Sequence, residues 1–303
     1  MSAEWIAISN QLAQATEQAG SHAVAVHTEA RGSSSGVIWR PGVVVTAEHA
    51  LRRDEELQVT LPNGKVVTAK LAGRDRSTDL AVLKCPEATA AAPLGESHSL
   101  KVGNVALVVG RTRASGPVAA LAFISLAVPE RRLWGGTALV PYLRLDVAIQ
   151  RTGVGGAVVD ANGRVVGIAT PRFSPGGAVV LPVATINRVV DALLEKGRIP
   201  RGYLGVGLQP VRLPENLRQT LQREGKTAAM VLEVEANGPA HKAGVVIGDI
   251  LVALNGKPVM RLEDVQAHLH GENIGKAVNA EFLRGGEKRA LNIVVGERPN
   301  GGD

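Results

Sequence analysis

Three short segments of this chain contain residue types suited to acid–base and oxyanion chemistry. His49 ends the apolar run "VVVTAEHAL", and Asp79 precedes the apolar run "DLAVLK". The third segment, "IQRTGVGGAVVD", places the glycine pair Gly155-Gly156 before a short apolar strand. In one large class of hydrolases a serine stands immediately before such a pair, whereas this chain has Val154 there. The central question is therefore whether the chain has a nucleophile.

The composition predicts a β-rich chain of two domains. A length of 303 residues is typical of two domains. Hydrophobic residues make up 45% and aromatic residues only 3%, so the core must be built from aliphatic side chains. The 35 glycines and 16 prolines imply many turns, which favours β-structure over helical bundles.

Charge, cysteine content and the N-terminal segment argue against several classes of protein: nucleic-acid-binding, disulfide-bonded and membrane-spanning. The net charge is +6, but the basic residues are scattered and few aromatics are available to stack on bases, so we expect no nucleic-acid partner. Cys85 is the single cysteine, so no intrachain disulfide can form. No signal peptide or apolar run of membrane-spanning length is apparent. We therefore expect no membrane span and a cytoplasmic location, or a periplasmic one only if a leader has been removed.

The pattern along the chain predicts where these segments lie. Residues 1–19 form an N-terminal helical segment. Six short apolar runs precede Cys85 and a similar series follows, which favours two antiparallel barrels at about 20–90 and 100–192, within a domain 20–198. Asn63-Gly64 and Asn162-Gly163 predict hairpins, and residues 186–197 predict a closing helix. Residues 199–297 form an α+β module, and 298–303 a tail.

The order of the three segments, with their flanking sequences, resembles one known family. The order His, Asp and then the glycine turn is that of chymotrypsin-type enzymes. Together with "SSGVIW", "TDLAVLK" and "GPAHKAGVVIGDILVALNG", it makes the chain similar to the HtrA/Deg family over roughly residues 20–297. That family joins a protease domain to PDZ domains. The resemblance implies a mainly β fold: a chymotrypsin-like double six-stranded β-barrel followed by a small α+β PDZ domain.

The resemblance also implies a role for each residue of the site. His49 matches the general base and Asp79 the carboxylate that orients it, while the backbone N–H groups of Gly153 and Val154 match the oxyanion site. The family motif is Gly-Asn-Ser-Gly-Gly, and this chain reads "TGVGG" with Val154 at the serine position. An isopropyl group cannot attack a carbonyl, so His49 and Asp79 are predicted to be a remnant dyad without a nucleophile.

Two hydroxyls offer an alternative nucleophile, and several nearby residues depart from the family pattern. Thr152 lies two positions upstream of Val154, and Ser174 lies in the next loop. If the turn keeps the family's shape, Thr152 should lie too far from His49 to share a hydrogen bond. Glu48 replaces a small residue, with its side chain expected to point away from His49. Three arginines, interpreted as solvated surface residues, lie in loops that border the family's cleft: Arg111, Arg113 and Arg151.

The C-terminal module carries a pattern that resembles a peptide-binding loop. The segment "RGYLGVGL" matches the loop and strand with which PDZ domains receive a C-terminal carboxylate. The predicted peptide-binding residues are Tyr203, Leu204, Gly205 and Val206, with Val265 and Leu269 from a helix at 262–270. His268 and His270 lie on different faces of that helix, so we predict no metal, and no motif indicates a cofactor.

These observations favour a pseudoprotease that binds peptides or the C-termini of unfolded proteins, in the setting of protein quality control. The alternative hypothesis is an active ATP-independent serine endopeptidase with a displaced nucleophile. A third hypothesis, a basic protein that binds nucleic acid or membrane surfaces, is supported only by the net charge. The family resemblance suggests a homo-trimer or a hetero-assembly with an active member. Trp5 and Ile8 would then pack against neighbouring subunits, or else onto their own barrel.

Overall fold

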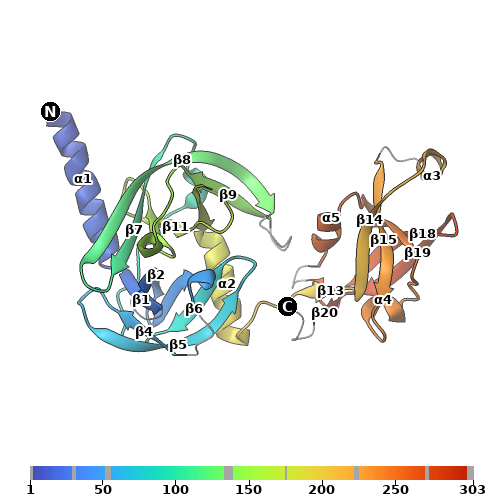
Figure 1. The fold of residues 1–303 in the computed structure, drawn as a ribbon, viewed down its shortest axis with the longest axis horizontal. Coiled ribbons are helices and arrows are strands. Elements are labelled where there is room, and N and C mark those ends of the chain that lie inside the picture. The colour runs from blue at the N-terminus through green and yellow to red at the C-terminus, as the bar shows by residue number, and fades with distance from the viewer. Residues whose placement is uncertain are drawn as a thin grey trace. The chain divides into compact units, whose positions relative to one another are not determined.

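The computed structural model describes residues 3–28, 32–51, 56–132, 139–174, 176–221, 225–269 and 273–298. The chain divides into two compact units at Ile199 and Pro200. The first unit holds two β-barrels and two long helices, and the second holds an antiparallel sheet with short helices (Figure 1).

The first barrel closes in the strand order β1-β2-β3-β6-β5-β4. Alternate apolar residues of the strands point into it, and its interior is almost entirely aliphatic, including Val24, Ile38, Val44 and Leu83. The strands are β1 (Ala23–Thr28), β2 (Gly32–Arg40), β3 (Val43–Ala47), β4 (Glu56–Thr60), β5 (Val66–Asp75) and β6 (Leu80–Lys84).

The second barrel closes in the order β10-β11-β12-β9-β8-β7 and has a core of the same kind. Its strands are β7 (Val105–Thr112), β8 (Gly116–Arg132), β9 (Leu139–Leu145), β10 (Ala157–Val159), β11 (Val165–Thr170) and β12 (Ala178–Pro182). The prediction of two closed six-stranded antiparallel barrels is thus confirmed.

Both predicted Asn-Gly hairpins form, and in each of them only the glycine has a positive φ angle. Asn63-Gly64 joins β4 to β5, and Asn162-Gly163 joins β10 to β11. Only the glycines adopt the left-handed conformation, with φ of 84° at Gly64 and 75° at Gly163. The Asn63 side chain instead accepts the N–H of Lys65, which closes the turn through a side-chain hydrogen bond.

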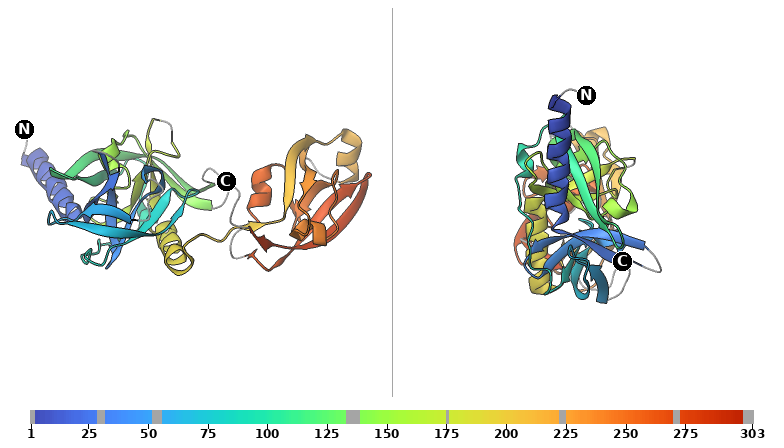
Figure 2. Two further views of the ribbon diagram at one scale, coloured as in Figure 1. Left: turned by 60° about the horizontal axis from the view of Figure 1, so that its bottom comes forward. Right: turned by 90° about the vertical axis from the view of Figure 1, so that its left-hand side faces the viewer.

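Helix α1 (Ala3–Gly20) packs only its C-terminal half against the barrels. Ala15, Ala19 and Gly20 are buried beside β7 and β8. The N-terminal half projects beyond the strands in both views of Figure 2. Its apolar residues are exposed, with 66% of Trp5 and 45% of Ile8 accessible, so these side chains do not pack onto their own barrel.

Helix α2 (Val183–Lys196) closes the first unit along its apolar face. Ile186, Val189, Val190 and Leu193 are buried, and Gly197 ends the helix with φ of 69°. The Trp39 indole N–H of β2 donates to the Asn187 side chain of α2 at 2.8 Å. The helix is therefore joined to the first barrel by a polar contact as well as by burial.

The second unit is an antiparallel sheet in the order β14-β15-β16-β18-β19, which leaves β14 at an edge. Its aliphatic core includes Val231, Leu251 and Phe282. Its elements are β13 (Gly202–Tyr203), β14 (Val206–Arg212), α3 (Glu215–Thr220), β15 (Thr227–Val234), α4 (Pro239–Lys242), β16 (Ile250–Leu254), β17 (Lys257–Pro258), α5 (Leu262–Gln266), β18 (Ala277–Arg284), β19 (Glu287–Val294) and β20 (Gly296–Glu297).

Helix α5 is shorter than the predicted helix at 262–270. It ends at Gln266, because the next turn tightens: the N–H of His268 bonds to the carbonyl of Val265, three residues back. Leu269 therefore lies beyond the helix, and His270 lies outside the described residues. Within the described part of the chain, no helix combines the length and apolar character required to cross a membrane.

An ion pair between a buried aspartate and a partly exposed arginine makes the stability of the second unit depend on pH. The fully buried carboxylate of Asp249 accepts two hydrogen bonds from Arg284, both at 2.8 Å, and one from the N–H of Val246. Burial alone would raise the pKa of Asp249, but Arg284 and the Val246 N–H hold this pKa below its ordinary value. The pair's contribution is thus complete above about pH 4 and is lost as the pH falls through the folded-state pKa.

We expect Asp249→Asn to lower the free energy of unfolding of this unit by about 1.5–3 kcal/mol at pH 7, because the buried side chain loses its charge-assisted hydrogen bonds from the partly exposed Arg284. The substitution should also flatten the acid-induced loss of stability. Hydrogen exchange of the β16 and β18 amides between pH 7 and 3 measures both effects. Glu287→Gln, which removes an exposed carboxylate paired with Arg289, is the matched control and should change little. Equal effects of the two variants would contradict this assignment.

Candidate functional site

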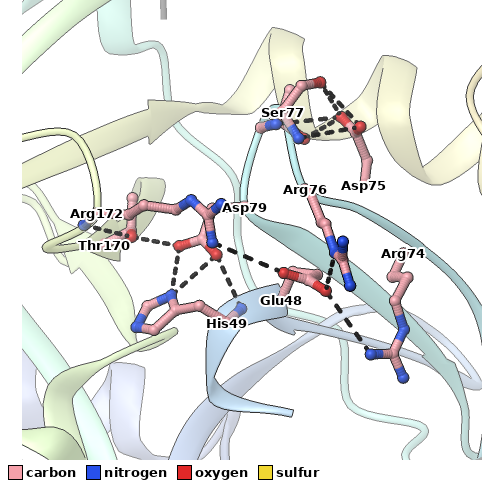
Figure 3. A network of polar contacts seen from close by, with 10 residues as sticks. Glu48, His49, Arg74, Asp75, Arg76, Ser77, Asp79, Thr170 and Arg172 are labelled. Atoms are coloured by element: carbon pink, nitrogen blue, oxygen red, sulfur yellow. Dashed lines mark hydrogen bonds and ion pairs between the residues drawn. The ribbon is translucent and has the colours of Figure 1, made fainter. Parts of the chain in front are cut away.

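His49 and Asp79 are in direct contact, as the sequence predicts for a dyad. His49 lies in the short 3₁₀ helix η1 (Glu48–Ala50) after β3, and Asp79 immediately precedes β6. The Nδ1 atom of His49 lies 2.9 and 2.8 Å from the two carboxylate oxygens of Asp79. The backbone N–H of His49 also donates to Asp79 at 2.9 Å, which fixes the carboxylate beside the imidazole (Figure 3).

Asp79 is completely buried and is held in an uncommon backbone conformation. Its φ of 58° lies in the left-handed region, which aspartate tolerates better than most residues. A further donor comes from the second barrel, because the Thr170 hydroxyl at the end of β11 donates to the Asp79 carboxylate. Thr170 in turn accepts the N–H of Arg172 at 3.1 Å. Both barrels therefore supply donors for one buried charge.

The second ring nitrogen of His49 is available for proton transfer. The side chain is 31% exposed, and Nε2 has no hydrogen-bond partner within the described ranges. Neither of the hydroxyls considered as alternative nucleophiles, Thr152 and Ser174, makes a hydrogen bond to His49. Ser174 is buried in the loop after β11, and the carbonyl of Thr152 accepts the hydroxyl of Ser35.

The turn around Val154 is held by backbone hydrogen bonds to both barrels. The Val154 carbonyl accepts the N–H of Ser35 in β2 at 2.9 Å, and the N–H of Gly155 donates to Ala169 in β11 at 3.0 Å. Gly155 has φ of 76°, and a Cβ there would collide with Ser35 and Ala47, so only glycine fits. The Val154 side chain is 6% exposed and takes no part in these hydrogen bonds.

The N–H groups predicted to form an oxyanion site are engaged within the same turn. Residues Arg151–Gly153 form the 3₁₀ helix η3. The N–H of Gly153 donates to Gln150 at 2.8 Å, and that of Val154 donates to Arg151 at 3.2 Å. Binding an oxyanion through these two donors would require the turn to open.

Glu48 forms a feature that the sequence analysis did not find. Its carboxylate is buried and lies within 4 Å of three guanidinium groups, those of Arg74 (3.7 Å), Arg76 (3.6 Å) and Arg172 (3.9 Å). Figure 3 shows this carboxylate on the opposite side of the turn from the His49 imidazole, as expected. The signal was present in "GRDRSTD", where two arginines flank the segment that leads to Asp79, but a contact with Glu48 requires the barrel geometry.

Arg111 is not the surface residue that we expected. Its guanidinium is buried and donates to the carbonyls of Ala23 at 2.8 Å and Gly20 at 3.2 Å, at the end of α1. Burial lowers the pKa of Arg111. Gly20 ends α1, where the helix carbonyls lack partners within the helix, and Ala23 begins β1, so Arg111 joins the end of the helix to the start of the first barrel. Arg113 and Arg151 are exposed, as predicted.

The second unit presents its predicted peptide-binding loop beside the edge strand β14. Gly205 has φ of 73°, and among the described residues no hydrogen bond is formed by the N–H groups of Leu204 and Gly205. Leu204 and Val265 are buried in the core, whereas Val206 and Leu269 are only partly buried. The loop thus offers two unused donors, next to apolar side chains that remain partly accessible.

The edge strand itself limits where a partner strand can pair. Pro210 lies inside β14 and has no N–H to donate. Proline is tolerated in a strand when its nitrogen faces the unpaired edge. The pairing shifts between Gly207 and Leu208, with the extra residue, Leu232, on β15. Strand β14 thus keeps its alternation, and the N–H groups of residues 206 and 208 face the open edge as well. Among the described residues, no group of three or more histidine, cysteine or acidic side chains is placed to hold a metal ion.

This architecture defines a protein with a trypsin-like protease fold and an appended PDZ domain. Residues 34–168 match the family model described as a trypsin-like peptidase domain, and residues 202–295 match that of the PDZ domain. A protein of Rhizobium meliloti (strain 1021), "Probable periplasmic serine endoprotease DegP-like", is 31% identical over 278 residues, covering 89% of this chain and 54% of that protein. A protein of the same name from Pseudomonas fulva (strain 12-X) is 31% identical over 279 residues, 89% of this chain and 57% of its own length.

Solved structures of similar proteins point to the same family. The structure titled "HtrA-type protease AlgW with tripeptide" is 28% identical, with a TM-score of 0.73 over 95% of this chain and 98% of its own. The serine endoprotease from Yersinia pestis is 27% identical, with a TM-score of 0.74 over 95% and 98%. The chain belongs to the HtrA/Deg family. It spans about half the length of the curated relatives it matches.

We expect the Thr170→Val substitution to lower the free energy of unfolding of the first unit by about 1–3 kcal/mol, because it removes one donor from the buried Asp79 carboxylate. Urea unfolding followed by the fluorescence of the buried Trp39 measures the change. The control is Thr170→Ser, which keeps the hydroxyl and should retain most of the stability. Wild-type stability of the valine variant would show that the interaction between the barrels does not hold the carboxylate.

Proposed function

We propose that this chain is a catalytically degenerate HtrA/Deg protein that binds peptides or unfolded protein without cleaving them. The observation that carries the proposal is Val154, a buried hydrocarbon side chain at the position of the family's serine. Acyl transfer requires a hydroxyl or thiol that gives its proton to a base. Val154 provides neither, and no pKa adjustment can replace the missing atom.

The surroundings of His49 support the same conclusion. Within the described ranges its imidazole bonds only to Asp79, and no hydroxyl shares a hydrogen bond with it, which supports the proposal. This disfavours the alternative proposal, an active endopeptidase with a displaced nucleophile. Thr152 and Ser174 would need to move into contact with Nε2 before either could be activated.

The survival of the dyad fits a structural role. Asp79 is a buried anion that accepts bonds from the His49 backbone, the His49 ring and Thr170. Removing one partner of a buried charge is costly, so retention of His49 is expected whether or not catalysis occurs. The dyad alone is therefore no argument for activity.

The exposed apolar half of α1 also bears on how the chain assembles. We propose that the exposed apolar half of α1, with Trp5 and Ile8, packs against other subunits of a homo-trimer or against an active family member. Large apolar side chains gathered on one projecting helix favour burial in an interface.

We expect the purified chain to leave an unfolded casein-like substrate intact and to remain unlabelled by a fluorophosphonate probe. Val154→Ser should restore little: its rate should stay at least about 100-fold below that of an active family member, because the oxyanion N–H groups are engaged within the turn. Mass spectrometry and fluorescence measure labelling and turnover. An adduct on any hydroxyl of the wild-type chain, abolished by His49→Ala, would establish the active alternative instead.

We expect peptide binding by the PDZ unit to require a free C-terminal carboxylate. The unused N–H groups of Leu204 and Gly205 would hold the carboxylate, and the peptide would pair with β14. Fluorescence polarisation with matched free and amidated peptides, both ending in an apolar residue, measures this. Amidation should weaken binding at least about 10-fold, since it removes the charge from these hydrogen bonds. Equal affinity of both forms would reject carboxylate capture.

A further inference from the structure

The outer surface of the second unit carries two acidic side chains without partners, next to the proposed peptide strand. Glu233 and Glu235 are both exposed, and within the described part of the chain neither carboxylate forms a hydrogen bond or an ion pair. Glu233 lies on β15, directly opposite Gly207 of the edge strand β14. The N–H of Glu235 donates to the carbonyl of Gly205 at 2.9 Å, so Glu235 flanks the carboxylate-binding loop.

The edge strand has no side chain where it faces these carboxylates. Gly205 and Gly207 alternate with Leu204, Val206 and Leu208, which pack in or against the apolar core. A Cβ built on Gly207 would lie 3.0 Å from the Cβ of Glu233 and 3.4 Å from its carboxylate oxygen Oε2. The Glu233 side chain therefore extends over Gly207 toward the free edge of the sheet.

The register of a bound peptide follows from the loop and from Pro210. If the terminal carboxylate binds the N–H groups of Leu204 and Gly205, the terminal side chain enters the groove beside Val206. The free N–H groups at 206 and 208 then pair with the last and third-last residues of the peptide. The penultimate residue stands opposite Gly207, and its side chain points outward, to the surface that holds Glu233.

We propose that Glu233 makes this PDZ unit select peptides with a lysine or arginine at the penultimate position. This inference rests on the proposed peptide binding and adds the chemical class of the ligand. The peptide backbone would lie two strand spacings from β15, about 10 Å away. A lysine side chain and a glutamate side chain together span that distance, and the missing side chain of Gly207 leaves the path open. Glu235 adds negative charge at the same end of the strand.

The test uses the full chain and fluorescein-labelled ten-residue peptides that end in Ala-Val-X-Leu, with X as Lys, Gln or Glu. At an ionic strength of about 10 mM the lysine peptide should bind roughly 3- to 10-fold more tightly than the glutamate peptide, and the glutamine peptide should fall between them. The preference should nearly vanish at about 1 M salt, where charges on the surface are screened.

Two variants assign the preference to its residue. Glu233→Gln should remove most of the preference for the lysine peptide over the glutamate peptide, and Glu233→Lys should reverse it. Glu287→Gln, the same charge change on the β18–β19 hairpin, should leave the ratio unchanged. No preference in the wild-type chain, or a full preference in Glu233→Gln, would overturn the inference while leaving carboxylate capture intact. Equal binding of free and amidated lysine peptides would instead reject the proposed peptide binding, and the inference with it.

Discussion

The first unit depends on satisfying one buried negative charge at the junction of its barrels. Asp79 has no exposed surface, and its donors come from two parts of the fold: the backbone and ring of His49 in the turn after β3, and the Thr170 hydroxyl at the end of β11. A buried carboxylate without donors would cost several kcal/mol. The barrels must therefore meet in the arrangement that brings Thr170 to Asp79, and His49 is fixed beside Asp79 as a consequence.

The same reasoning explains why a valine at position 154 is compatible with an intact turn. The contacts of the Val154 segment run through backbone atoms, to Ser35 on one side and Ala169 on the other. Gly155 supplies the conformation that no other residue fits. The side chain at 154 thus contributes burial but no hydrogen bond, and a valine can occupy a position whose chemistry required a hydroxyl. The fold of this turn therefore does not require a hydroxyl at position 154.

The sequence predicted the elements better than it predicted their long-range polar contacts. The alternation of apolar residues and the Asn-Gly pairs were sufficient for both barrels, because strand period and turn chemistry are local properties. The contact between His49 and Asp79 followed from the family resemblance. The cluster around Glu48 and the burial of Arg111 were missed, since each joins segments far apart in the chain. A charged residue in a loop is usually exposed, and only tertiary structure reveals the exceptions.

Pro210 gives the edge of the PDZ sheet a built-in stop. With no donor at this position, a strand that lies along β14 loses its hydrogen-bonding ladder after about four residues. A short, flexible chain end can use that stretch fully, whereas a long β-strand from another molecule would leave its next carbonyl unpaired. The proline therefore limits the length of a strand that can be added to this edge. It favours the binding of short chain ends over the continuous edge-to-edge pairing from which fibrils form.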